Sequence, residues 1–198
     1  MTENNRLPAS TRAKVARQFW QGPVLEKAQS ALGMVLVRQD KGNAMRGRIV
    51  EVEAYGGSDD PASHAYRRRT PRNASMFGPG GVAYVYFVYG MHFCFNIVTG
   101  RENEAAAILV RALEPLENLH GRTDGPARLC AALNIDRRLN GIALDGDTLW
   151  LEPGDSPLPA HQIACTPRIG INPASLGAER PWRFFVRDNP NVSKPLRR

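Results

Sequence analysis

The feature that most constrains the fold is a pair of apolar and aromatic segments, 82–88 and 92–98, joined only by Tyr89-Gly90-Met91. β-branched and aromatic residues favour strands, and so short a link is typical of antiparallel pairing. The two segments therefore predict a β-hairpin. Tyr84 and Tyr86 would share one face of the first strand, because successive side chains in a strand alternate between faces.

Patterns elsewhere predict a mixture of helices and short strands. We expect helices from Ser10 or Thr11 to about Trp20, from Pro23 until Gly33, and from Gly125-Pro126 to about Leu133, with strands at 34–37, 46–53, 107–113, 149–151, 168–170 and 182–186. The stretch 56–81 is expected to be irregular. Short connections favour antiparallel pairing, so we predict an α+β fold. Residues 1–198 would form a single domain with a curved antiparallel β-sheet flanked by helices and a protruding β-hairpin, and residues 1–10 are expected to be flexible.

Size and charge narrow the class of protein. The 198 residues suffice for one domain with a core, and the net charge of +7 is compatible with a polyanionic partner without proving one. The three cysteines are far apart and form no CxxC pair, which argues against a disulfide framework and a zinc ribbon. Neither a signal-peptide core nor a membrane-length apolar run is visible, so we expect a cytoplasmic protein.

Several polar and aromatic residues are candidates for chemistry. Glu51 and Glu53 would point to one face of their strand, but this segment alone favours a solvated edge over a site. Arg111 interrupts an apolar run and would need an anionic partner, for which Glu53 is a candidate; a plain ion pair is the alternative. His64 alone reads as a surface residue. The basic run of Arg67, Arg68, Arg69 and Arg72 fits either a solvated loop or contacts with phosphates.

Tyr89 is unusual, because an aromatic side chain at a hairpin tip is poorly buried. A flat exposed ring suits insertion between bases, and the tyrosines below it could sandwich an extruded base. From this pattern alone, an amphipathic hairpin whose tyrosines belong to the core is the favoured alternative.

Taken in order, these pieces resemble one family. The motifs are Val52-Glu53-Ala54-Tyr55-Gly56, His64, Thr70-Pro71-Arg72-Asn73, Met76-Phe77, Tyr84-Val85-Tyr86, Tyr89-Gly90-Met91, Phe93-Cys94, Asn96, Arg111-Ala112-Leu113-Glu114-Pro115, Gly125-Pro126, Arg168-Ile169-Gly170 and Arg183-Phe184. Together they resemble the alkyladenine (3-methyladenine) DNA glycosylases of the mammalian type. The resemblance runs from about Leu25 to Ser193. It departs at His92, where mammalian members usually carry a tyrosine, and in the loop after His64, which is one residue shorter.

The resemblance implies a role for each matching residue. Glu53 would be the general base that activates water, and Arg111 would help to hold that water. The nucleic-acid-binding set would comprise Tyr55, His64, Arg68, Arg72, Met76, Tyr84, Tyr86, Tyr89, Met91, His92, Asn96 and Ile169. Within it, Tyr89 would be the wedge, Tyr55, His64 and Tyr86 would enclose the flipped base, and Asn96 would discriminate against guanine. The backbone carbonyl of Ile169 would complete the water site, and Arg68 and Arg72 would lie near the DNA backbone.

The implied activity is that of a monofunctional DNA glycosylase acting on alkylated or deaminated purines in duplex DNA. We expect no metal, no cofactor, no membrane association and a monomer, located with the nucleoid of a bacterial-type cell. Two other classes stay open. A DNA- or RNA-binding module would share the wedge but would not require the pair of Glu53 and Arg111. A glycosidase of free nucleosides would need neither the wedge nor the basic loop.

Overall fold

The computed structural model describes residues 13–193. Its elements, in chain order, are the 3-10 turn Arg17–Trp20, α1 (Val24–Ala31), β1 (Val35–Asp40), β2 (Asn43–Tyr55), the 3-10 turn Ala74–Phe77, β3 (Ala83–Val88), β4 (His92–Thr99), β5 (Ala106–Pro115), α2 (Pro126–Ala132), the 3-10 turn Arg137–Leu139, β6 (Leu149–Glu152), the 3-10 turn Ala160–Gln162, β7 (Ile163–Thr166) and β8 (Arg183–Val186). Ser10, Thr11 and the segment expected to be flexible, residues 1–10, lie outside the described residues.

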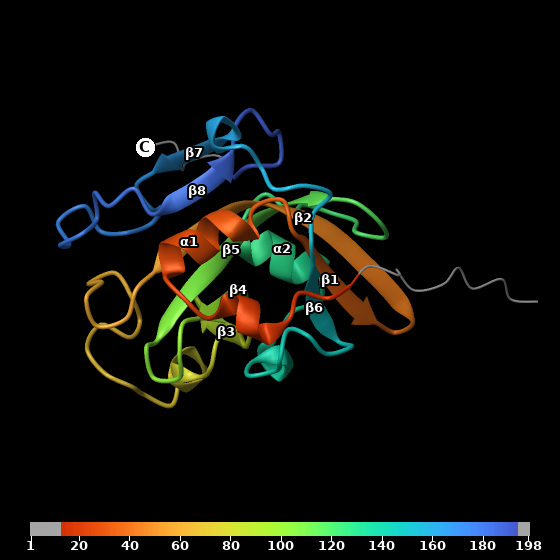
Figure 1. The fold of residues 1–198 in the computed structure, drawn as a ribbon. Helices are drawn as coiled ribbons and strands as arrows, with labels where there is room; N and C mark the ends of the chain where they lie inside the picture. The colour runs from red at the N-terminus through yellow and green to blue at the C-terminus, as the bar shows by residue number, and fades with distance from the viewer. Residues whose placement is uncertain (1–12, 194–198) are drawn as a thin grey trace, which may run out of the picture.

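The described strands form one antiparallel sheet. Its order is β3-β4-β5-β2-β1-β6, and β8 joins β2 beyond the end of β1 and also pairs with β7. Figure 1 shows this sheet curling around α1 and α2, with β7 and β8 at one end of the curl. The predicted α+β fold with a curved antiparallel sheet and a hairpin formed by β3 and β4 is therefore confirmed.

Alternation along the strands gives the sheet two different faces. Val52, Val85, Phe95 and Ile108 belong to the main core, which also contains Leu129 of α2. The intervening positions point to the opposite face, where Tyr84, Met76, Val98 and Ala107 form a second, smaller cluster. One face of the sheet thus packs on the helices, and the other face is available for a site.

Two predictions about individual elements need comment. Helix α1 ends as predicted, since Gly33 follows it with a φ of +85°, a conformation that glycine adopts without strain. The predicted strand at 168–170 is wrong: Ile169 and Gly170 form a turn, and the strand lies earlier, at Ile163–Thr166. The buried ion pair of Arg168 with Asp60 holds this turn against the loop that follows β2.

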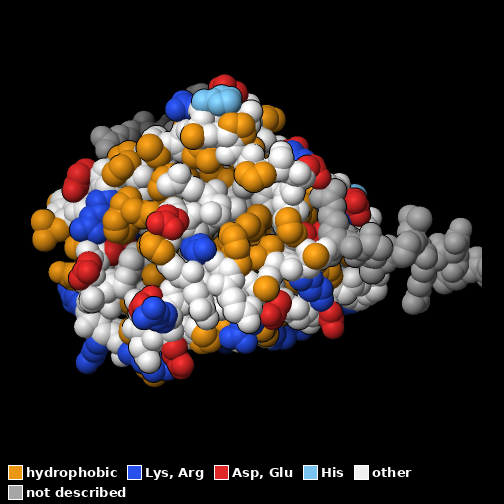
Figure 2. All heavy atoms as spheres, in the orientation of Figure 1, with side chains coloured by type: hydrophobic (Ala, Val, Ile, Leu, Met, Phe, Trp, Pro, Cys, Tyr) orange, Lys and Arg blue, Asp and Glu red, His pale blue; other side chains and the backbone are white. Residues whose placement is uncertain are grey.

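Within residues 13–193, no helix is both long and apolar enough to cross a membrane. On the face of the molecule drawn in Figure 2, basic and acidic side chains are interspersed among apolar ones. The net positive charge is therefore not gathered into one basic area on this face.

Candidate active site

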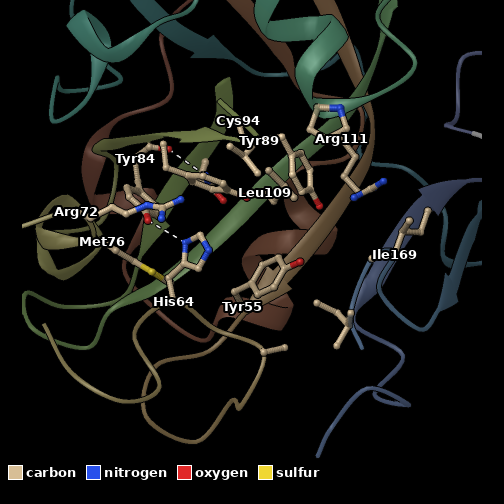
Figure 3. A pocket seen from close by; sticks show the side chains of 17 residues that line it. Tyr55, His64, Arg72, Met76, Tyr84, Tyr89, Cys94, Leu109, Arg111 and Ile169 are labelled. Atoms are coloured by element: carbon tan, nitrogen blue, oxygen red, sulfur yellow. Dashed lines mark hydrogen bonds between the residues drawn. The ribbon is translucent and has the colours of Figure 1, made fainter. Parts of the chain in front are cut away.

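A cavity of about 270 Å³ opens on the sheet face that carries the second cluster. This volume is close to the lower end of the range for small-ligand pockets, about 300–1,000 Å³. The predicted site residues that line it are Tyr55, His64, Arg72, Met76, Tyr84, Tyr86, Tyr89, Asn96, Arg111 and Ile169. The lining residues that sequence reasoning missed are Ala62, Val88, Cys94, Leu109, Pro126, Gly170 and Ile171. Figure 3 shows these side chains converging from the strands, the loop after β2 and the segment around Ile169.

Glu53 lies directly behind the pocket wall and is fully buried. Its Oε2 accepts a hydrogen bond of 2.9 Å from the Tyr55 hydroxyl, and its Oε1 accepts one of 2.7 Å from the Ile169 N–H. Arg111 Nη1 is 3.2 Å from Oε1, so the predicted partnership between Glu53 and Arg111 is confirmed. The favoured interpretation of Glu51 and Glu53 as a solvated edge is wrong, because both carboxylates are fully buried and their strand is paired with β5 on one side and β8 on the other.

Protonation of the residues around Glu53 follows from burial and charge. Burial, and then the Glu53 carboxylate, raise the pKa of Tyr55 well above 10, so this phenol stays protonated and donates. Burial alone would lower the pKa of Arg111, but the Glu53 and Glu51 carboxylates outweigh it and the pKa is raised. The site therefore holds a charged guanidinium and a neutral phenol against the same carboxylate.

The far wall of the pocket is aromatic. His64 Nδ1 is 2.9 Å from the Tyr84 hydroxyl, and the His64 and Tyr86 rings meet edge to face with centroids 4.6 Å apart. Partial burial, and then the charge of Arg72, lower the pKa of His64, which favours its neutral form. Burial raises the pKa of Tyr84 to about 12. His64 is solvent-exposed, as predicted for a surface residue, and it also lines the pocket.

The hairpin tip stands beside this pocket. Tyr89 is 86% exposed and adopts a φ of +52°, and Met91 is 69% exposed. Tyr84 is 1% exposed and Tyr86 is half-buried, so the expected core role holds for Tyr84, which also lines the cavity. His92 is exposed at the start of β4.

The remaining predicted residues are placed as follows. Asn96 is buried, and its side-chain amide donates a 3.0 Å hydrogen bond to the Tyr84 carbonyl on the paired strand. Arg68 is exposed and lies in a neighbouring basic pocket rather than in the cavity, whereas Arg72 lines both and donates to the Phe87 carbonyl. At Ile169 the N–H, not the carbonyl, contacts Glu53.

In residues 13–193, no group of three or more His, Cys, Asp or Glu side chains is placed to hold a metal ion.

Sequence comparison gives the class and the family. A family model described as "Methylpurine-DNA glycosylase (MPG)" matches residues 18–190. Proteins named "Putative 3-methyladenine DNA glycosylase" in Myxococcus xanthus and Carboxydothermus hydrogenoformans are similar, with 49% identity over 178 residues and 45% over 190. These alignments cover 89% and 90% of this chain and 91% and 97% of those proteins.

The chain therefore belongs to the DNA glycosylase class. Its site combines a buried carboxylate, an aromatic pocket and an exposed tyrosine. Within that class, the chain belongs to the methylpurine-DNA glycosylase family.

Proposed function

We propose that this protein is a monofunctional DNA glycosylase that starts base excision repair by removing alkylated or deaminated purines from duplex DNA. The observation that carries the proposal is the placement of Glu53, a buried carboxylate with two hydrogen-bond donors and an ion pair to Arg111, directly behind a pocket with a base-sized aromatic wall. The names of the relatives support action on 3-methyladenine. Assignment to the mammalian type stays a prediction, since these relatives are bacterial.

In the proposed reaction, Glu53 takes a proton from water as the water oxygen bonds to C1′ of the deoxyribose. The N-glycosidic bond breaks and its electron pair leaves with the base. The carboxylate also offsets the positive charge that develops on the sugar in an oxocarbenium-like transition state. Cationic bases such as 3-methyladenine and 7-methylguanine leave without further protonation. Neutral bases such as hypoxanthine and ethenoadenine need a proton at N7, which we assign to water or a backbone group.

The proposed recognition step uses the pocket and the hairpin. Tyr89 would enter the base stack as the damaged nucleotide leaves it, and Tyr55, His64 and Tyr86 would enclose the flipped base. Asn96 would discriminate against the exocyclic amine of guanine. Stacking on each aromatic ring is worth about 1–3 kcal/mol, which helps to offset a flipping cost of a few kcal/mol.

The pocket also bears on the two other classes. A pure binding module would have no use for a buried carboxylate held by Arg111, and a nucleoside glycosidase would have no use for an 86% exposed tyrosine at the pocket rim. Among the described residues that line the pocket there is no lysine to form a Schiff base with the sugar, which supports hydrolysis without strand cleavage. We further propose that the enzyme acts as a monomer without a cofactor.

Glu53→Gln tests the chemistry. The amide keeps the size of the side chain but cannot take a proton, so we expect single-turnover base release to fall by at least a hundredfold. The assay uses duplexes carrying 3-methyladenine, hypoxanthine or ethenoadenine, and binding is measured on a duplex with a reduced abasic site, which has no base to release. Binding should stay within about threefold of wild type. Full release by this variant contradicts the proposed mechanism.

A further inference from the structure

Glu51 lies two residues before Glu53 on the same face of β2, and like Glu53 it is fully buried and does not line the cavity. It is held from three separate elements of the fold. Its Oε1 accepts from Arg111 Nε at 3.0 Å, from Arg183 Nε at 2.7 Å and from the Ser193 hydroxyl at 2.7 Å. Its Oε2 accepts from the Ser193 N–H at 2.6 Å. The group thus joins β2, β5, β8 and the segment after β8.

The two carboxylates differ in which residues hold them. Glu51 accepts four hydrogen bonds, three on Oε1 and one on Oε2, and two of the three residues that donate them do not line the cavity. Glu53 accepts two hydrogen bonds and forms an ion pair with Arg111, and all three of its partner residues line the cavity. Glu53 is therefore held by residues of the cavity wall, whereas Glu51 is held mainly by the structure behind that wall.

Arg111 connects the two carboxylates. Its Nε binds Glu51 and its Nη1 lies 3.2 Å from Glu53. Because the guanidinium is a rigid planar fork, fixing the Nε edge also fixes the direction of Nη1. Arg111 in turn lines the cavity, whereas Glu51, which binds its Nε, does not.

The charges beneath the pocket balance only when Glu51 is included. Two carboxylates, those of Glu51 and Glu53, face two guanidinium groups, those of Arg111 and Arg183. Arg183 offsets Glu51 and is itself fixed by Thr166 and the Ser193 carbonyl. Without the Glu51 charge, Arg111 and Arg183 would face Glu53 with one excess buried positive charge, and Arg111 would lose its anchor.

We propose that Glu51 is a positioning residue for base release, which acts through Arg111 to set the geometry at Glu53. This inference rests on the proposed function, since it assigns to Glu51 a part in the reaction at Glu53. It separates two neighbouring buried glutamates by role: one exchanges a proton with water, and the other fixes the guanidinium beside it.

The test compares Glu51→Gln with a matched control, Glu152→Gln. Glu152 is also almost fully buried and also pairs with an arginine, Arg46, but it lies on β6, away from the cavity. For Glu51→Gln we expect single-turnover release to fall at least tenfold, with binding to the reduced abasic duplex within about twofold of wild type. For Glu152→Gln we expect a lower unfolding midpoint and a release rate within about twofold of wild type.

A double-mutant cycle shows whether Glu51 acts through Arg111. We expect Arg111→Lys combined with Glu51→Gln to release base no more slowly than the slower single variant, because both substitutions disrupt one arrangement. Arg111→Lys combined with Glu152→Gln should simply multiply the two effects. If Glu51→Gln does not fold, Arg183→Lys supplies a milder change, since it keeps the charge but loses the bond from Nε. For it we expect a severalfold slower release.

Release at the wild-type rate by Glu51→Gln would overturn the inference. If Glu51→Gln does not fold, release at the wild-type rate by Arg183→Lys would overturn it instead. In either case the proposed function stands as long as Glu53→Gln is inactive. Independent effects in the cycle with Arg111 would overturn it as well. Full release by Glu53→Gln contradicts the proposed function itself, and the inference falls with it.

Discussion

Four charged side chains lie together, one in the pocket wall and three behind it, and each is at most 7% exposed: Arg111, Glu51, Glu53 and Arg183. Moving an unpaired charge out of water costs several kcal/mol, so such groups persist only in mutually satisfied sets. At the scale of single residues, the site is therefore a network in which changing one member affects all the others. Truncating one partner of this network therefore lowers the free energy of unfolding far more than truncating one partner of an exposed ion pair.

His64 gives the residue-scale prediction for pH. Its pKa is lowered in the folded protein, so between its ordinary value of 6.5 and that lowered value the unfolded chain binds more protons than the folded one. Stability that is fully present above pH 6.5 should therefore decrease as the pH falls through this window. We expect His64→Gln to reduce that decrease, as measured by urea unfolding at several pH values. An unchanged pH dependence would contradict the lowered pKa. His120→Gln serves as the control, because His120 is exposed and does not line the pocket.

At the scale of elements, the hairpin of β3 and β4 combines a regular body with a strained tip. The strands pair without interruption from Ala83 opposite Ile97 to Val88 opposite His92. Both Tyr89 and Gly90 then adopt positive φ, of +52° and +70°. Glycine tolerates this conformation, whereas a tyrosine pays a cost of about 1–2 kcal/mol. Strain at an exposed aromatic tip is consistent with selection for function rather than for stability.

We therefore predict that Tyr89→Asn changes stability and activity in opposite directions. Asparagine is common at positive φ and, followed by Gly90, gives the turn sequence most favoured in hairpins. The free energy of unfolding should rise by about 0.5–1 kcal/mol, measured with urea. Release from a lesion duplex should fall by about tenfold or more, and release from the same lesion in a single strand should fall less.

Equal losses on duplex and single-stranded DNA would contradict the wedge role of Tyr89. Gly90→Ala is the matched control for the turn. Its added Cβ would meet nothing within 4 Å, so it changes only the backbone preference and not the neighbouring contacts. It should cost about 1 kcal/mol of stability and leave the ring of Tyr89 in place.

At the scale of the whole molecule, segments distant in sequence close over one face of the sheet. Arg168 bridges them, since it pairs with Asp60 through both Nη atoms, at 2.5 Å and 2.8 Å, and donates to the Ala54 carbonyl. Its guanidinium also lies 4.7 Å from the centre of the Tyr55 ring. The same residue precedes Ile169, whose N–H binds Glu53. Assembly of the site thus depends on this clasp between two loops.

Asp60→Asn should weaken the clasp. It leaves the buried Arg168 charge without its counterion, so we expect a loss of about 3–5 kcal/mol in the free energy of unfolding, measured with urea. Asp124→Asn is the control, because its pairs with Arg122 and Arg128 are largely exposed and worth about 1 kcal/mol or less. A loss at Asp60 no larger than that at Asp124 would contradict the role of the clasp.

Much of the fold followed from local patterns. The hairpin could be predicted because aromatic and β-branched segments flank a three-residue link, and α1 because its apolar spacing ends at Gly33. The turn at Ile169 and Gly170 was mistaken for a strand, because three residues carry too little pattern to show that a distant ion pair fixes them. The role of the basic loop could not be predicted from the sequence either, because Arg72 lines the cavity and Arg68 does not.

The sequence by itself determined which residue types alternate along each strand, and hence the apolar core, the exposed aromatic tip and the ordered motifs of the family. Only the tertiary structure decided that Glu51 and Glu53 are buried rather than solvated. The reason is physical: a carboxylate can leave water only when donors surround it, and here those donors come from β5, β8, the Ile169 turn and Ser193. No local stretch of sequence contains that set.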